Sequence, residues 1–140
     1  MTLKNIKETE HGEFKIRVIN DQTSAGEKDR IEENAVGTFR TEKGRFYIKY
    51  RANEYLNMIR IEDETVTVSR SGDIKSHMRY ELGKCTEFLY STPYGDIPMK
   101  IHTSLVETEL GIDGGIVKLE YILDTGGDKY KNSMRIIIER

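Results

Sequence analysis

The triplet Asp124-Thr125-Gly126 is the feature of this sequence that most directly suggests catalysis. Asp-Thr-Gly is the signature of aspartic proteases, in which two carboxyl groups share one proton, and small dimeric enzymes of that kind carry one triplet per subunit. Only fourteen residues follow Gly126, and the last nine of them form one expected strand. Too little chain remains for a flap and for the loop that holds the paired aspartates. We therefore interpret residues 124–128 as a hairpin turn.

The other reactive side chains are isolated along the chain. His11, His77 and His102 have no second ligand at metal-site spacing, so we predict no metal site. Cys85 is the single cysteine, which excludes a disulfide framework. The sequence identifies no His or Asn partner for it, and we interpret it as an inert thiol. Nucleophile elbows, phosphate loops and dinucleotide fingerprints are absent from the sequence, so we predict no cofactor and consider an enzyme the least favoured class.

A more informative signal comes from polar residues that occupy core positions in alternating segments. Arg70 follows Val66 and Val68 at a spacing of two, and several tyrosines and a threonine follow apolar residues in the same way. Burying a guanidinium or a hydroxyl without a partner costs kilocalories, so such groups need water, internal partners or a ligand. The candidate binding residues in the interior are Tyr50, Val68, Arg70, Tyr80, Thr103 and Tyr121. The alternative is that Arg70 reaches into solvent from a strand end and the tyrosines bond one another.

The elements that must position these residues are β-strands, because apolar residues recur at every second position. In the segment from Phe14 to Val18, apolar residues alternate with Lys15 and Arg17. We expect strands over 13–20, 45–51, 58–62, 65–70, 74–80, 86–91, 97–103, 117–123 and 133–139, separated by turns rich in Gly, Asp and Asn. Residues 24–34 lack a sustained apolar face and read as a polar loop that leads into a strand. Because open sheet edges invite aggregation, we predict an antiparallel meander that closes into an all-β barrel of about 8–10 strands.

Composition limits the functional classes further. The chain has 140 residues, 22 basic and 24 acidic, and a net charge of −2, so the two signs nearly cancel. This balance argues against binding to nucleic acid or to a membrane surface. We find no apolar run near the ~20 residues that span a bilayer and no signal peptide, and therefore expect a soluble, cytoplasmic protein. With two prolines and no linker-like stretch, we expect residues 1–140 to form a single domain.

From about Ile31 to the C-terminus the chain resembles a bacterial protein family. The segment from Ser69 through Gly72 to Lys75, continuing to Gly83, looks like the YwiB-like family, whose members are chains of about this length. Collinear similarities run through the rest of the chain, namely Gly37 with Phe39, Tyr47 to Tyr50, Tyr94-Gly95 followed by Met99, Ile101 and Thr103, Gly115 with Leu119 and Tyr121, and Asn132-Ser133-Met134 followed by Ile136 to Ile138. The N-terminal strand before Asn20 matches more loosely.

The resemblance implies a calycin-like (lipocalin-like) β-barrel and no established activity. Calycin relatives bind hydrophobic small molecules inside the barrel, although fold analogy alone does not assign a function. The leading hypothesis is therefore a non-enzymatic binding module for a small amphipathic or anionic molecule, present as a monomer or a homodimer. The alternative is an interaction or structural barrel that engages a protein through its outer face or an edge strand.

Overall fold

The computed structural model describes residues 10–140, which form ten β-strands and no helix. The strands are β1 (Glu10–Ser24), β2 (Glu27–Glu42), β3 (Arg45–Ala52), β4 (Tyr55–Glu62), β5 (Thr65–Ser71), β6 (Ser76–Glu81), β7 (Cys85–Thr92), β8 (Gly95–Gly111), β9 (Gly114–Asp124) and β10 (Lys129–Glu139). The prediction of an all-β antiparallel fold is confirmed. No helix long and apolar enough to cross a membrane occurs in this part of the chain.

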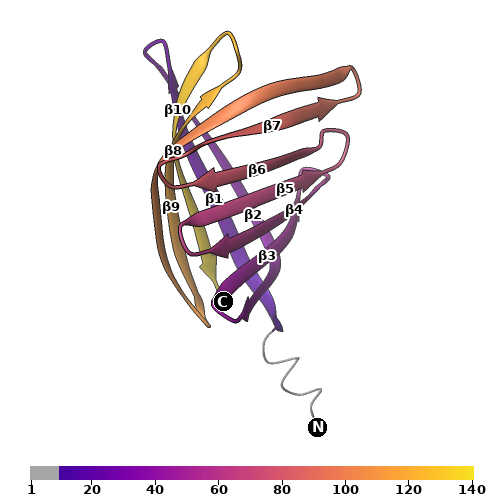
Figure 1. Cartoon of the computed structure of the whole chain (residues 1–140). Helices are drawn as coiled ribbons and strands as arrows, with labels where there is room; N and C mark the ends of the chain where they lie inside the picture. The colour runs from indigo at the N-terminus through magenta and orange to yellow at the C-terminus, as the bar shows by residue number, and fades with distance from the viewer. Residues whose placement is uncertain (1–9) are drawn as a thin grey trace.

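All ten strands belong to one antiparallel sheet, ordered β6-β5-β4-β3-β2-β1-β10-β9-β8-β7. The sheet curls until its two edge strands, β6 and β7, meet, and the short strands β3 to β7 then cross in front of the long ones (Figure 1). Two sets of backbone hydrogen bonds join the edges. Lys75 and Ser91 exchange two bonds of 2.9 Å, while Thr103 bonds to Gly83 and Lys84 at 2.9 and 3.1 Å. The predicted meander is thus a nearly closed barrel.

The two ends of the barrel differ. The turns after β2, β4, β6 and β8 lie at one end, which we call the closed end, and the turns after β1, β3, β5, β7 and β9 lie at the other, the open end. Toward the closed end the interior is apolar. Phe39 packs edge to face on Phe14 with ring centroids 5.2 Å apart and stacks on Phe46 at 5.9 Å. Fully buried aliphatic residues complete this core, namely Ile16, Ile48, Ile61, Val66, Val117, Leu119, Ile136 and Ile138, and Ile101 is equally buried on the open-end side of Thr103.

β2 leaves its neighbour β3 halfway along the barrel. β2 pairs with β3 only from Gly37 to Glu42, so the outer edge of residues 27–36 has no paired strand within the described chain. Gly37 stands where the strands separate, and a Cβ atom there would lie 2.8 Å from the Cβ atom of Tyr50 and would also meet the carbonyl oxygen of Lys49. The absence of a side chain at Gly37 therefore allows β2 and β3 to approach closely at the last shared pair.

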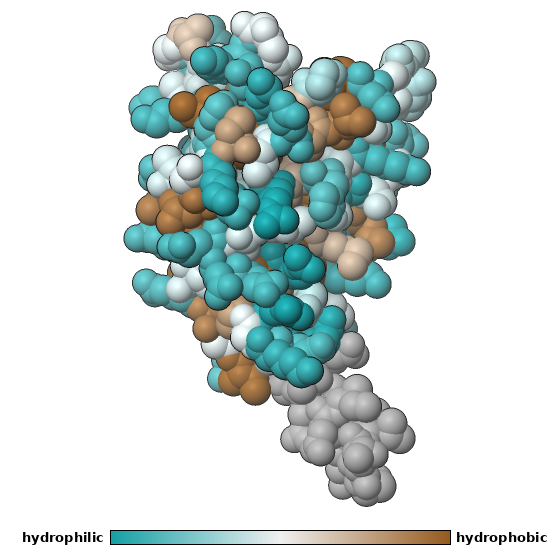
Figure 2. All heavy atoms as spheres, viewed as in Figure 1, coloured by the Kyte–Doolittle hydropathy of each residue, from teal (hydrophilic) through white to brown (hydrophobic). Residues whose placement is uncertain are grey.

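Charged residues cover the outside of the barrel. Figure 2 shows a mainly hydrophilic face with small scattered hydrophobic patches. The cross-strand ion pairs there are exposed, for example Arg17–Glu32 at 3.1 Å and Arg45–Glu62 at 3.1 Å. Exposed pairs contribute about 0–1 kcal/mol each, so these add little to the stability of the barrel.

The prediction of a polar loop over residues 24–34 is wrong. β1 runs to Ser24 and β2 begins at Glu27, joined by a tight turn in which Ala25 and Gly26 both have positive φ, 51° and 81°. This conformation suits a two-residue hairpin turn. Both strands extend past the core at this point, so their residues need no apolar alternation, and the pairing is held by backbone bonds and by the Arg30–Asp21 ion pair of 2.6 Å.

Candidate functional site

All six predicted binding residues lie on the interior face of the barrel. Directly paired residues of antiparallel strands share a face, and the register places Tyr50 opposite Asn57, Asn57 opposite Arg70, and Thr103 opposite Tyr121. Five of the six are buried, with exposed fractions of 1–8%, namely Tyr50, Val68, Tyr80, Thr103 and Tyr121. Arg70 differs because 34% of its side chain stays exposed.

Arg70 is held at the open end by three neighbours. Its Nε donates to Oδ1 of Asn57 at 3.0 Å, and one terminal nitrogen lies 3.6 Å from Oε1 of Glu33. The hydroxyl of Tyr50 donates to the same Glu33 oxygen at 3.2 Å. The guanidinium also lies 5.5 Å from the ring centroid of Tyr55, within cation–π range. The charge of Arg70 is therefore already balanced by Glu33, while part of its surface faces solvent.

Deeper in the barrel, polar side chains form a layer between the apolar core and the open end. Asn20 and Gln22 each donate to Oδ1 of Asn132 at 3.1 Å. The rings of Tyr80 and Tyr121 meet edge to face with centroids 4.7 Å apart. We call these five residues together with Thr103 the polar layer. Two of its buried atoms, Oδ1 of Asn20 and Oγ1 of Thr103, have no hydrogen-bond partner.

Burial sets the titration of the interior tyrosines. It raises the pKa of Tyr50 well above the usual tyrosine range, and the carboxylate of Glu33 raises it further. Burial raises the pKa of Tyr80 strongly, with a further contribution from Tyr121. For Tyr121, burial raises the pKa while hydrogen bonds with Tyr80 and Asn20 oppose the shift. All three side chains are therefore neutral phenols at physiological pH, able to donate or accept a hydrogen bond.

Above the polar layer, interior-facing apolar residues remain partly exposed. Ile31, opposite Asn20, is 53% exposed, and Ile97, opposite Tyr90, is 43% exposed. Other members of this rim are half-buried, namely Met78, Tyr90, Met99 and Leu123. We call this set, with Ile31 and Ile97, the apolar rim. These large apolar side chains point into the barrel but are not covered. The open end is therefore accessible to a molecule that has both polar and apolar parts.

Two cavities lie near these residues, and neither is lined by Arg70, Tyr80, Thr103 or Tyr121. One, of about 580 Å³, lies at the rim beside the turn after β9. Its walls combine the interior-facing Phe88 and Met99 with Leu89 and Pro98 from the outer face. The other, of about 840 Å³, is a groove on the outer face of β2 to β6, and Tyr50 is the one predicted residue that contributes to it. Tyr80 and Tyr121 themselves are buried, with exposed fractions of 1% and 6%.

Sequence reasoning missed four residues that contact the predicted ones. Asn20 and Asn132 continue the apolar alternation of β1 and β10, and Asn57 precedes Ile59 and Ile61 at the same spacing. Glu33 is a carboxylate on the interior face, opposite Val18, with 12% of its side chain exposed. If the alternation is continued past the apolar segments of these strands, it places all four residues on the interior face.

The other reactive residues have different surroundings. Asp124 caps its own turn by accepting a bond of 2.9 Å from the backbone N–H of Gly126, so the hairpin interpretation of the Asp-Thr-Gly triplet is confirmed. Cys85 does have a partner that the sequence did not reveal, since His102 lies directly opposite on β8 with Sγ 3.7 Å from Nε2. This pair lies on the outer face and is exposed.

Comparisons with known proteins agree with this architecture. The sequence profile of a domain of unknown function, DUF1934, matches residues 16–136. The chain belongs to the DUF1934 family. It is 23% identical over 119 residues to the uncharacterized β-barrel protein YwiB of Bacillus subtilis strain 168, which covers 81% of this chain and 84% of that protein. The crystal structure of the B. subtilis ywiB protein superposes with a TM-score of 0.84 and 19% identity over 96% of each chain. The match to the DUF1934 profile starts at Ile16, so β1 belongs to the shared domain, although the resemblance was expected only from about Ile31.

Proposed function

We propose that this DUF1934 protein is a non-enzymatic binding protein that takes a small amphipathic molecule at the open end of its barrel. The ligand's polar head would meet the polar layer and Arg70, and its apolar part would lie against the apolar rim. The calycin-like comparison, in which ligands lie inside a barrel, favours the same arrangement by analogy.

The observation that carries this proposal is the pair of unpartnered buried atoms. Oδ1 of Asn20 lies on the residue paired with the exposed Ile31. Oγ1 of Thr103 lies below the buried Ile101, which Met99 and Ile97 follow toward the open end. A buried polar atom without a partner costs about 1–3 kcal/mol, and a ligand head group would remove that cost. The Arg70–Glu33 pair favours a head group that is neutral overall, because a free anion would compete with Glu33 for the guanidinium.

Native mass spectrometry after exposure to a bacterial metabolite extract tests the proposal. We expect a small molecule to remain bound to the wild-type protein and to be lost from Ile97→Arg, which places a charge in the apolar rim. Ile112→Arg is the matched control, since Ile112 is 58% exposed in the turn at the closed end. Equal retention by both variants, or no bound molecule in the wild type, would contradict the proposal.

A second candidate function rests on the free edge of β2. Residues 27–36 present backbone groups that no described strand pairs with, and Ile31 and Val36 on this segment are more than half exposed. Such an edge can accept a strand from a protein partner. Light scattering distinguishes the two functions. A self-associated or partner-bound species that dissociates in the Val36→Lys variant would support strand addition at the free edge of β2. We further propose a cytoplasmic location, in keeping with a chain that has a single cysteine.

A further inference from the structure

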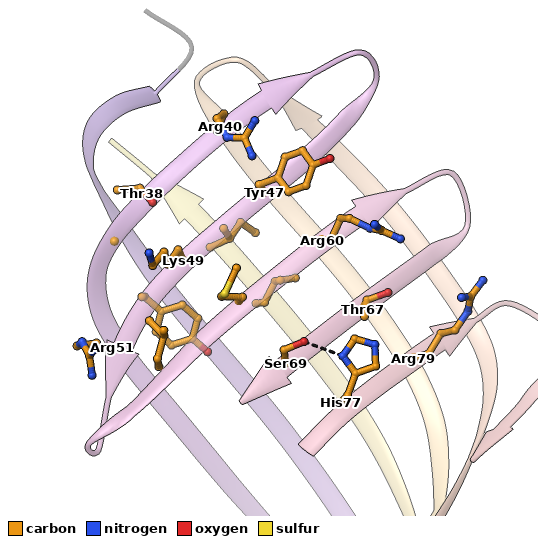
Figure 3. Close-up of a pocket in the computed structure, with 16 residues that line it drawn as sticks. Thr38, Arg40, Tyr47, Lys49, Arg51, Arg60, Thr67, Ser69, His77 and Arg79 are labelled. Atoms are coloured by element: carbon orange, nitrogen blue, oxygen red, sulfur yellow. Dashed lines mark hydrogen bonds between the residues drawn. The ribbon is translucent and has the colours of Figure 1, made fainter. Parts of the chain in front are cut away.

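The outer groove over β2 to β6 carries a regular ladder of cations (Figure 3). One row across the sheet reads Arg40, Tyr47, Arg60, Thr67 and Arg79, one residue from each of the five strands. The next row reads Thr38, Lys49, Met58, Ser69 and His77. Arginines therefore occupy every second strand of the first row, about 10 Å apart from the spacing of neighbouring strands. This regularity follows from strand register and not from any motif visible along the chain.

The groove has a lining that donates hydrogen bonds and carries no negative charge. Its sixteen lining residues include five Lys or Arg side chains and a histidine, and none is Asp or Glu. Ser69 and His77 are joined by a bond of 2.7 Å, and Thr38 and Thr67 add hydroxyl groups. The net charge of the whole chain is −2, so this groove is far more positive than the protein as a whole. A lining of this kind suits a ligand rich in acceptor oxygens.

Three of these cations have no acidic partner. Arg40 pairs with Glu42 at 2.8 Å and Arg79 with Glu81 at 3.4 Å, both at the edge of the groove near the closed end. Among residues 10–140, Lys49, Arg51 and Arg60 form no ion pair. Lys49 and Arg51 stand two residues apart on one face of β3, and Arg60 is the diagonal neighbour of Lys49 on β4. Lys49 lies about 7–8 Å from Arg60, whereas Arg51 and Arg60 lie on opposite sides of Lys49, about 13 Å apart along the strands. The three side chains therefore form a strip that can bind a chain of phosphate groups.

We propose that this groove binds a small molecule that carries a polyphosphate chain, with the phosphate groups held by Lys49, Arg51 and Arg60. The groove's volume of about 840 Å³ falls in the range of small-molecule sites, roughly 300–1,000 Å³. Leu56, Met58 and Tyr47 give the ligand's organic body an apolar surface beside the cations. The site is separate from the open end of the barrel and does not depend on the proposed function there.

The charges around the groove favour a compact ligand over a nucleic-acid strand. A row of Glu42, Glu62 and Glu81 borders the groove toward the closed end, with Asp63 in the adjoining turn. A long polyanion would meet these carboxylates, and three unpaired cations neutralise few of its phosphates. A compact phosphorylated molecule can extend from Arg60 toward Lys49 and Arg51, away from the acidic row.

Methyl-labelled methionine offers a direct reporter of this site. Met58 is 50% exposed within the groove, whereas Met78, Met99 and Met134 face the barrel interior. In a ¹³C-methyl NMR titration at low salt we expect ATP and tripolyphosphate to shift the Met58 signal and adenosine to leave it unchanged. The interior methionine signals should not move. No shift of Met58 at millimolar ATP, or an equal shift with adenosine, would overturn the proposal.

A charge-matched pair of variants shows whether the named residues hold the phosphate. Lys49→Gln with Arg60→Gln should weaken ATP binding at least tenfold, because two of the three cations that contact the phosphate chain are lost. Lys118→Gln with Lys131→Gln removes the same charge from the outer face of β9 and β10 and should change the affinity less than twofold. Equal weakening in both would indicate a general charge effect and overturn the proposal. So would binding of a twelve-nucleotide single-stranded RNA without binding of ATP or tripolyphosphate. All four positions are exposed, so unchanged thermal midpoints should confirm that the variants fold.

Discussion

Arg70 and Glu33 join two strands that are not neighbours in the sheet. Their side chains approach to 3.6 Å across the open end, where β2 has left β3 and no backbone bond crosses the opening. Asn57 and Tyr50 bond to the two partners from the strands between them. Residues 27–36 of β2, whose outer edge has no paired strand within residues 10–140, therefore contact β5 through side chains alone.

The energetic role of this pair can be measured by a double-mutant cycle. Glu33 is 12% exposed and Arg70 34%, so the pair lies between an exposed one, worth about 0–1 kcal/mol, and a fully buried one, where losing one partner costs about 3–5 kcal/mol. We expect Glu33→Gln and Arg70→Met each to lower the free energy of unfolding by about 1–2 kcal/mol in urea denaturation. The double variant should lose less than the sum. Additivity within about 0.5 kcal/mol would show that the contact is not energetically coupled.

Thr103→Val should stabilise the protein. Oγ1 of Thr103 is buried without a partner, and valine has the same shape without the hydroxyl, so the free energy of unfolding should rise by about 1 kcal/mol. Thr86→Val is the matched control with the opposite sign, because the Thr86 hydroxyl donates to the carbonyl oxygen of Arg79. If Thr103→Val were as destabilising as Thr86→Val, the hydroxyl of Thr103 would have a hydrogen-bond partner in the free protein.

Stability should fall at alkaline pH because of the interior tyrosines. Tyr50, Tyr80 and Tyr121 have folded-state pKa values above the unfolded value of about 10. The unfolded chain then releases these protons first, so the free energy of unfolding is flat below pH about 10 and decreases above it. The slope reaches about 1.4 kcal/mol per pH unit for each tyrosine that ionises only on unfolding. Urea titrations between pH 8 and 11 measure this, and Tyr80→Phe should reduce the slope. A slope unchanged by that substitution would argue against Tyr80 as a source.

Gly37→Ala should destabilise the barrel at the point where β2 separates from β3. The new Cβ atom would lie 2.8 Å from the Cβ atom of Tyr50 and against the backbone of Lys49, so one strand must move. Such overpacking costs about 1–3 kcal/mol. Gly127→Ala, in an open turn with nothing within 4 Å of the added atom, is the control and should change the thermal midpoint little. Similar midpoints for the two variants would mean that β2 and β3 separate without strain.

Much of this fold follows from the alternation of residues at a spacing of two. That rule correctly placed Arg70, Tyr80 and Tyr121 on the interior face, because each continues an apolar segment within a strand. It failed at residues 24–34, where both strands project past the core and burial no longer selects apolar residues. Glu33 was missed for the same reason, since it belongs to that projecting part of β2.

The arrangements between strands could not be read from the chain. The ladder of Arg40, Arg60 and Arg79 depends on the register of five strands, and a shift of one residue in any of them would turn a member to the other face. The contact between Cys85 and His102 depends likewise on the pairing of β7 with β8. Neighbouring positions on a sheet are set by turn lengths and bulges, which a sequence pattern specifies only loosely.

The most direct test of ligand binding at the open end is a ¹³C-methyl NMR titration with octyl glucoside below its critical micelle concentration, because this probe joins a neutral polar head to an apolar tail. We expect saturable shifts of the Met78 and Met99 signals, with the Met58 signal on the outer face unchanged. Octanoate, with an anionic head, should bind more weakly. Unmoved Met78 and Met99 signals at millimolar octyl glucoside, or a shift confined to Met58, would contradict ligand binding at the open end.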